Sequence, residues 1–420
     1  MKKVFIIFIA AVISLQARAQ ISNIFADQFP DSAKMRIGVV AEYGINSTAF
    51  TNQFVSKFYR GGYIDTDLKN LVLGRIRNTN RIGADVNSGV YIAIKPDSVF
   101  HNKYLSIFCS IRDRQHFDAR FSKDFFKVGF YGNSQFAGEI ANLNGFNLNL
   151  LRYQQLQIGL FSTKLDSSAH WGIGVSFLKG EEYTSVLAKT AELFTSEDGQ
   201  YIDFNTSLQV TQSDTSHKGL GAFNGYGASV DIYFEAPFKT RLGNSKLRIS
   251  VADVGLIRFN DKSLVLKQDS LFHFTGFKIN SIYDLEDPTF KSASQDSIIN
   301  TIAPFQKQSF SVTLPATLNL NFETQFSRRF YLTEGIRYVF NANYTLLAYI
   351  KSDFYIHPKV MISATFAYGG YGHFNYGLGV FANIGKGFLI YAGSNNVEGY
   401  IAPKKTSGQG AYISLVKNFK

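Results

Sequence analysis

Apolar and polar residues alternate along many segments of the chain. In the clearest of them, residues 311–326, apolar side chains occupy nearly every second position and Ser, Thr, Asn, Glu and Gln occupy most of the others. The same alternation recurs at residues 170–177, 221–236, 360–368 and 374–384. A period of two residues is that of a β-strand, and the helical period fits none of these segments. The pattern therefore predicts an all-β chain.

The apolar faces of these strands are typical of contact with lipid. A soluble β-sandwich also has strands with one apolar face, but water usually meets Lys and Glu on the other face, whereas here the polar positions are often Gly, Ser, Thr and Asn. Charged residues make up only 18% of the chain and aromatic residues 15%, against about 25% charged residues in an average soluble domain. We therefore predict a transmembrane antiparallel β-barrel, with a secreted sandwich or adhesin as the alternative.

The candidate strands predict a barrel of about 14 strands, with 12 and 16 as alternatives, because bacterial single-chain barrels have even numbers of strands. Residues 357–359 and 385–386 are expected to be short turns. The longest polar insertion, residues 280–308, is expected to be a long extracellular loop. Residues 20–420 are thus predicted to form a single outer-membrane β-barrel domain.

The start of the chain has the pattern of a secretory signal peptide. Two lysines follow Met1, an apolar run covers residues 4–15, and Ala17-Arg18-Ala19 precedes Gln20. Such a small-x-small triplet is the usual cleavage site, and the apolar run is too short for a membrane anchor. We therefore expect residues 1–19 to be removed before Gln20 and the mature chain to be exported to the outer membrane.

One segment, residues 54–78, breaks the strand pattern. Leu68, Leu71, Val72 and Arg75 follow one another at helical spacing, and Asp65 is placed to cap the helix. We predict a short helix over 64–77, inserted between the first two strands. Its apolar stripe is narrow and lies among charged side chains, which include Asp67 and Arg77. We therefore interpret it as a plug in the lumen or a cap at the rim, and an ordinary loop helix is the alternative.

The sequence offers little chemistry for catalysis or metal binding. The seven histidines show no close metal-ligand spacing, and the single cysteine, Cys109, excludes an intrachain disulfide. His116 lies near Asp113 and Asp118, an arrangement that we interpret as a charged hairpin tip. We therefore predict a non-enzymatic protein with no catalytic residue, no cofactor and no metal ion.

We interpret the net charge of +11 as favouring contact with lipid and not binding of nucleic acid, because the chain is expected to be exported. Small basic clusters at residues 327–330 and 403–405 would meet anionic headgroups at a barrel rim. The predicted partners are therefore outer-membrane lipid and lipopolysaccharide, together with the barrel-assembly machinery. Other outer-membrane proteins are further candidate partners, and nucleic acid is not expected.

The last segment, residues 410–420, also alternates. We expect Ala411, Ile413, Leu415 and Phe419 to face lipid on a strand that closes the barrel against the first strand, because a closed barrel leaves no unpaired edge in lipid. Ser414 would then face the lumen. The aromatic residue near the end resembles the carboxy-terminal signal that bacterial barrel-assembly machinery recognises.

Four sequence blocks together resemble a known family. They are the ending ARAQ of the signal peptide, RIRNTNRIGADVNSGVYIAI (75–94), LRISVADVGLIRF (247–259) and the stretch from SNNVEGYIAP (394–403) to GAYISLVKNF (410–419). They are similar to a family of Bacteroidota outer-membrane barrels catalogued as a domain of unknown function. More distantly, the plan resembles barrels of the fatty-acid-transport type, which implies 14 strands and an internal plug, although the long amino-terminal hatch of that type is missing here.

Three functions remain open from the sequence. The first is passive transport of a small or hydrophobic solute, with helix 64–77 restricting the lumen. The second is a structural or accessory subunit of an outer-membrane secretion, assembly or gliding machine, in which the barrel is filled and its loops bind partners. The third is an outer-membrane enzyme or adhesin. The sequence identifies neither the solute nor the partner.

Overall fold

The computed structural model describes residues 33–163, 169–275 and 305–420. The proposed signal peptide and nearly all of the predicted loop 280–308 lie outside the described residues. Fourteen antiparallel strands form a closed barrel, as predicted. In order around the wall, its elements are β1 (Met35–Ser47), β2 (Asn80–Ile94), β3 (Leu105–Phe121), β5 (Phe146–Ser162), β6 (His170–Thr195), β8 (Gly225–Thr240), β9 (Gly243–Phe259), β12 (Phe310–Thr313) continued by β13 (Thr317–Gln325), β14 (Phe330–Val339), β15 (Thr345–His357), β16 (Val360–Gly370), β17 (Phe374–Gly385), β18 (Phe388–Ser394) and β19 (Gly408–Phe419).

The barrel closes between its first and last strands. β1 and β19 pair antiparallel from Met35 opposite Phe419 to Asn46 opposite Gly408. Because β1 also pairs with β2 along its whole length, neither edge of the first strand is left unpaired. Closure therefore leaves no strand edge whose backbone N–H and C=O groups would lack hydrogen-bond partners in lipid.

The alternation of apolar and polar residues predicted from the sequence corresponds to the outer and inner faces of the barrel wall. On β6, Trp171, Val175 and Phe177 are exposed on the outer face, whereas Gly172 and Ser176 are buried on the inner face. The same division holds on the other barrel strands, whose inner faces carry most of the buried polar residues. In the part of the chain that the structure describes, no helix has the length and apolar character needed to cross a membrane.

The predicted strand 311–326 is wrong in one respect, because it is interrupted. Pro315 separates β12 from β13, and a proline has no backbone N–H to continue the ladder. Both pieces still pair with β9. Leu314, before the break, is fully buried in an apolar cluster on the inner side of the wall, whereas Leu320, beyond the break, is exposed.

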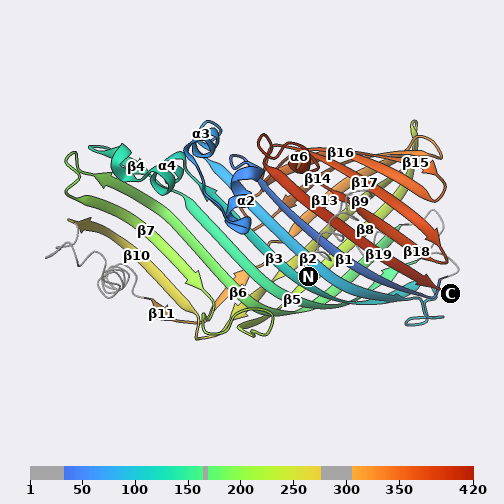
Figure 1. Cartoon of the computed structure of the whole chain (residues 1–420). Helices are drawn as coiled ribbons and strands as arrows, with labels where there is room; N and C mark the ends of the chain where they lie inside the picture. The colour runs from blue at the N-terminus through green and yellow to red at the C-terminus, as the bar shows by residue number, and fades with distance from the viewer. Residues whose placement is uncertain (1–32, 164–168, 276–304) are drawn as a thin grey trace.

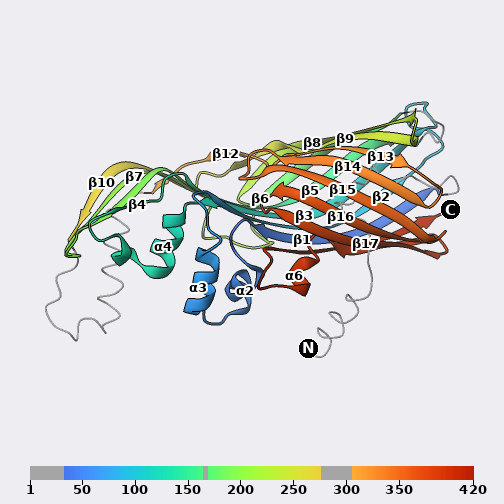
Figure 2. The same cartoon turned by 90° about the horizontal axis from the view of Figure 1, so that it is seen from above.

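A small sheet projects beyond the barrel. β6 is 26 residues long; its first half pairs with β8 and its second half pairs with β7 (Ile202–Gln212). β7 pairs in turn with β10 (Leu264–Phe274), β4 (Ile140–Asn142) pairs with the end of β6, and β11 (Gln306–Lys307) pairs with the start of β10. Figures 1 and 2 show this extension as the group of strands on the left, beyond the closed part of the barrel.

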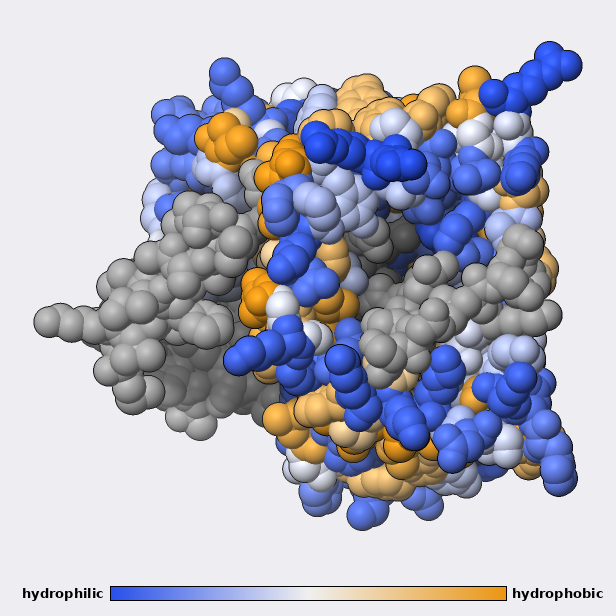
Figure 3. All heavy atoms as spheres, turned by 90° about the vertical axis from the view of Figure 1, so that its right-hand side faces the viewer, coloured by the Kyte–Doolittle hydropathy of each residue, from blue (hydrophilic) through white to orange (hydrophobic). Residues whose placement is uncertain are grey.

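The two ends of the barrel differ in their connections. The end that carries the C-terminus has tight turns, such as the one at Lys386 and Gly387 between β17 and β18, and hydrophilic side chains gather around this end (Figure 3). The longer connections at the other end carry helices: α2 (Asn52–Arg60) and α3 (Thr66–Leu73), α4 (Lys123–Tyr131) with the 3-10 helix η1 (Asn133–Phe136), and α6 (Glu398–Ile401).

Candidate functional site

A histidine between two carboxylates lies on the inner face of the wall. Asp85 of β2 and His116 of β3 are direct cross-strand partners, and Asp118 follows two residues later on the same face. The Nδ1 atom of His116 lies 2.7 Å from an Asp85 carboxylate oxygen, and its Nε2 atom lies 2.9 Å from one of Asp118. A carboxylate only accepts hydrogen bonds, so this arrangement favours the doubly protonated, cationic imidazole.

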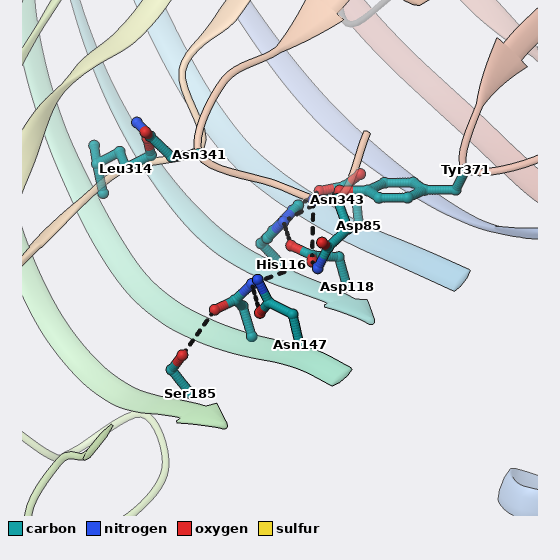
Figure 4. A network of polar contacts seen from close by, with 10 residues as sticks. Asp85, His116, Asp118, Asn147, Ser185, Leu314, Asn341, Asn343 and Tyr371 are labelled. Atoms are coloured by element: carbon teal, nitrogen blue, oxygen red, sulfur yellow. Dashed lines mark hydrogen bonds and ion pairs between the residues drawn. The ribbon is translucent and has the colours of Figure 1, made fainter. Parts of the chain in front are cut away.

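Two connections from elsewhere in the barrel reach this histidine (Figure 4). Asn343, between β14 and β15, donates its backbone N–H to Asp118 at 3.2 Å, and its side-chain amide donates to the same oxygen. The hydroxyl of Tyr371, between β16 and β17, lies 3.3 Å from His116 Nε2. Side chains from distant parts of the chain thus meet inside the lumen at the His116 network, by which we mean Asp85, His116, Asp118, Asn343 and Tyr371.

Glycine makes room for the tyrosine. A Cβ atom at Gly83 would lie 2.2 Å from the ring of Tyr371, so the ring packs directly on the backbone of β2. The ring of Tyr344 stands edge-on to the ring of Tyr371, with the centroids 4.9 Å apart. The position of Tyr371 is therefore fixed by packing as well as by its hydroxyl group.

A luminal cavity of about 180 Å³ adjoins this network. It is lined from several sides of the barrel, by strands from β1 to β5 and from β13 to β17. Its charged lining residues are Glu42, Asp85, Arg114, His116 and Arg337, and its tyrosines are Tyr153, Tyr344, Tyr349 and Tyr371. The space exceeds that of one water molecule, which needs only about 10–15 Å³, so the cavity has room for a small solute.

Ion pairs continue from the cavity along the lumen. Arg114 lies 2.7 Å from Asp253, a residue at positive φ where β9 bulges, and Gln155 donates to the same aspartate. Further along, Arg248 lies 2.6 Å from Glu235 and 2.9 Å from Glu323. Several charged groups of the lumen are therefore held in ion pairs.

The predicted helical insertion is present, but it consists of two helices, and it lies outside the lumen. Asp65 caps α3 by accepting from the backbone N–H of Leu68 at 2.8 Å. Leu68 and Val72 are buried in an apolar cluster with residues of α2, α4 and the outer face of β2 and β3, among them Phe121. Phe121 has the opposite parity to Asp118, so these helices pack on the outside of the wall, as Figure 2 also shows. Of the three placements considered, a plug, a cap at the rim and a loop helix, the plug does not match this position beside the barrel mouth.

The remaining residues predicted in this insertion lie around that cluster. Leu71 is exposed on α3, and Asp67 lies in its first turn. The Arg75 side chain donates to the Lys405 carbonyl at 3.0 Å and to Ser407, and the backbone N–H of Arg77 donates to Asn80. None of the predicted insertion residues lines the luminal cavity.

The predicted closure residues lie on β19. Ile413 and Leu415 are exposed on its outer face and Ala411 is half-buried there, while Ser414 is buried on the inner face. Phe419 pairs with Met35. The neighbouring Lys417 lies with its ammonium group 4.1 Å from the centre of the Phe388 ring and donates to the Lys386 carbonyl.

The sequence analysis missed the luminal residues. His116 is not at a hairpin tip, because β3 continues to Phe121 and places it inside the barrel. Glu42, Asp85, Arg337 and Tyr371 carried no helical or metal-ligand spacing that would have marked them. The available signal was weaker: charged residues on the polar face of an alternating strand, as Asp85 is within residues 75–94.

A family model matches residues 32–395. The chain belongs to the Family of unknown function (DUF5723). A search of curated proteins finds no match. The matched residues include all barrel strands except β19, and the description of the family names no activity.

The search of solved structures finds transport proteins at low sequence identity. The Pseudomonas putida toluene transporter TodX is 11% identical, with 98% of this chain and 93% of that chain covered and a TM-score of 0.42. The Ralstonia pickettii toluene transporter TbuX is 9% identical, covers 92% and 90%, and has a TM-score of 0.43. A Pseudomonas aeruginosa FadL homologue is 11% identical, covers 92% and 91%, and has a TM-score of 0.44.

Proposed function

We propose that this chain is a non-enzymatic outer-membrane β-barrel that lets a small solute pass through its lumen. The observation that carries the proposal is the cavity of about 180 Å³ between facing parts of the wall, lined by charged groups and tyrosines. Binding cavities are typically enclosed spaces with a few convergent polar groups. The two solute classes that the sequence left open, small and hydrophobic, both require a route through this region.

The His116 network is the proposed constriction. Asn343 and Tyr371 lie in connections between strands, and their hydrogen bonds to Asp118 and His116 hold these connections across the lumen. A connection can move without breaking the barrel ladders, because its residues do not belong to the paired strands. Displacement of these two side chains would widen the route beside the cavity.

The test is passage through the purified barrel. We compare the wild type with the double variant Asn343→Ala, Tyr371→Ala in planar bilayers and in a liposome-swelling assay. The double variant is expected to conduct more than the wild type. A matched control is Tyr368→Ala, since Tyr368 lies near the end of β16 but is exposed on the outer face. If neither the wild type nor the double variant conducts or admits any solute, the transport proposal is wrong.

An accessory role is the second candidate, and the projecting sheet favours it. Among the described residues, the outer edge of β10 pairs with β11 only at Leu264 and Val265. A strand edge with unpaired backbone groups can add a strand from another chain. Crosslinking from a photoreactive residue at Leu271, which is exposed on β10, tests this role: capture of one defined outer-membrane protein supports it, and crosslinking to lipid alone contradicts it.

Lipid contact is the third part of the proposal. The helices beside the mouth expose apolar side chains, including Phe58 of α2 and Ile401 of α6, and α2 also carries the basic residues Lys57 and Arg60 in its last turn. Aromatic and basic side chains together suit a membrane interface with anionic headgroups. A double variant Lys57→Gln, Arg60→Gln is expected to bind lipopolysaccharide more weakly than the wild type in a pull-down, and unchanged binding would contradict this contact. The barrel-assembly machinery remains the proposed partner of the last strand during insertion.

A further inference from the structure

One arginine of the luminal cavity makes no hydrogen bond and no ion pair with the residues that the structure describes. Arg337 lies on β14 and lines the cavity. Its Nε atom is buried and has no hydrogen-bond partner, and no carboxylate among the described residues lies within ion-pair distance of its guanidinium group. Arg114 and Arg248, in contrast, lie 2.7 Å and 2.6 Å from their carboxylates. A charged group that is taken out of water without a partner is costly unless something else pairs with it.

A carboxylate on another strand of the cavity wall is also unpaired among the described residues. Glu42 lies on β1 and also lines the cavity. Within the described part of the chain it makes no hydrogen bond and no ion pair. Asp85, the other acidic residue of the lining, is held by His116 at 2.7 Å. Arg337 and Glu42 lie close enough to be electrostatic neighbours across the cavity, yet they are not in contact.

Two groups of opposite charge thus line the same cavity. A carboxylate can bind a guanidinium group through two parallel hydrogen bonds, and an ammonium group can donate to Glu42. The cavity lining also includes Tyr344 and Tyr371, which are electrostatic neighbours of Arg337. Aromatic rings also suit an ammonium group, because the ring face attracts cations.

We propose that this cavity binds a small zwitterionic solute of the amino-acid class, with its carboxylate on Arg337 and its ammonium group on Glu42. This inference rests on the proposed transport function and names the class of solute for it. A solute with only one of the two charges leaves the other protein group unpaired. The site therefore discriminates by charge pattern, since truncation of one partner of a buried charge pair weakens binding by roughly 30-fold or more.

The test uses the full-length barrel in nanodiscs and isothermal titration calorimetry. The probes are alanine, its amide, which lacks the carboxylate, and N-acetylalanine, which lacks the ammonium group. Alanine is expected to bind roughly 30-fold or more tightly than either derivative. Arg337→Gln should abolish the preference for alanine over the amide, and Glu42→Gln should abolish the preference for alanine over N-acetylalanine.

Arg258→Gln is the control, because Arg258 is exposed on the outer face of β9, and it should bind alanine like the wild type. A gel shift between unboiled and boiled samples checks that each variant is folded. Equal binding of all three probes by the folded wild type, or no binding of any, overturns the inference. Passage of solutes without this preference leaves the transport function intact, whereas selective alanine binding without any passage overturns the transport function and keeps the site.

Discussion

The carboxylate of Glu181 lies 2.9 Å from the Nε atom of Arg152, at the point where β6 leaves the barrel. Arg152 pairs with Glu182 and Tyr153 pairs with Gly180, so Glu181 is the extra residue of a β-bulge. A bulge bends its strand and increases the local twist. Beyond it, β6 turns from its partner β8 to β7, so the ion pair stabilises the place where the extension begins.

We expect Glu181→Gln to lower the free energy of unfolding by about 2–3 kcal/mol, because Glu181 is fully buried and loses its charge, while Arg152 keeps Asp113 at 3.0 Å. The loss of one partner of a buried pair costs about 3–5 kcal/mol when nothing else compensates. Urea unfolding in micelles, monitored by the gel shift, measures this change in the free energy of unfolding. Glu197→Gln, at an exposed turn position, is the control, and an equal effect of both variants would show that the buried pair is not special.

Gly83→Ala should disturb the His116 network through Tyr371. The added methyl group meets the tyrosine ring, which must move and lose its contact with His116; forcing an extra carbon into a packed site costs about 1–3 kcal/mol. Gly44→Ala is the matched control, since a Cβ atom there meets nothing within 4 Å. Both variants are compared by urea unfolding and by conductance. If Gly44→Ala is as destabilising as Gly83→Ala, backbone effects and not the tyrosine explain the loss.

The two carboxylates beside His116 should contribute unequally. Asp85 is the nearer at 2.7 Å, but its side chain is 49% exposed, whereas Asp118 at 2.9 Å is fully buried. Water screens the first pair and not the second. Double-mutant cycles with His116→Gln, Asp85→Asn and Asp118→Asn should therefore give a coupling energy of about 2–3 kcal/mol for Asp118 and at most about 1 kcal/mol for Asp85. The reverse order would mean that distance and not burial decides.

The sequence predicted the wall well and the lumen poorly. Because one face of each strand contacts lipid, apolar residues such as Trp171, Val175 and Phe177 recur at every second position or a multiple of it. This alternation can be recognised within one segment, without knowledge of the rest of the chain. The break at Pro315 was visible in principle, because proline interrupts a ladder. The predicted helix was found as well, since helical spacing is also local.

The luminal site depends on contacts between residues far apart in the sequence. Asn343 meets Asp118 across 225 positions, and Tyr371 meets His116 across 255. A period of two places His116 and Asp118 on one face but cannot say which distant loop faces them. The position of α3 stayed open between the lumen, the rim and a loop for a related reason. Its apolar stripe needed a partner, and the sequence did not show that the ends of β2 and β3 continue with apolar outer residues such as Phe121.

The last strand allows a direct test of lipid contact. Ile413 is exposed on the outer face of β19, between Ala41 of β1 and Ala392 of β18. We expect Ile413→Arg to lower the free energy of unfolding by about 2–4 kcal/mol, the cost of an arginine near the bilayer midplane, whereas a basic residue near the interface costs about 0–1 kcal/mol. Lys417→Arg, on the same face four positions nearer the end of the strand, should leave stability unchanged. Urea unfolding in lipid vesicles measures both variants. If Ile413→Arg unfolds like the wild type in vesicles, β19 does not face lipid at that depth, and the membrane must cross the barrel at another level.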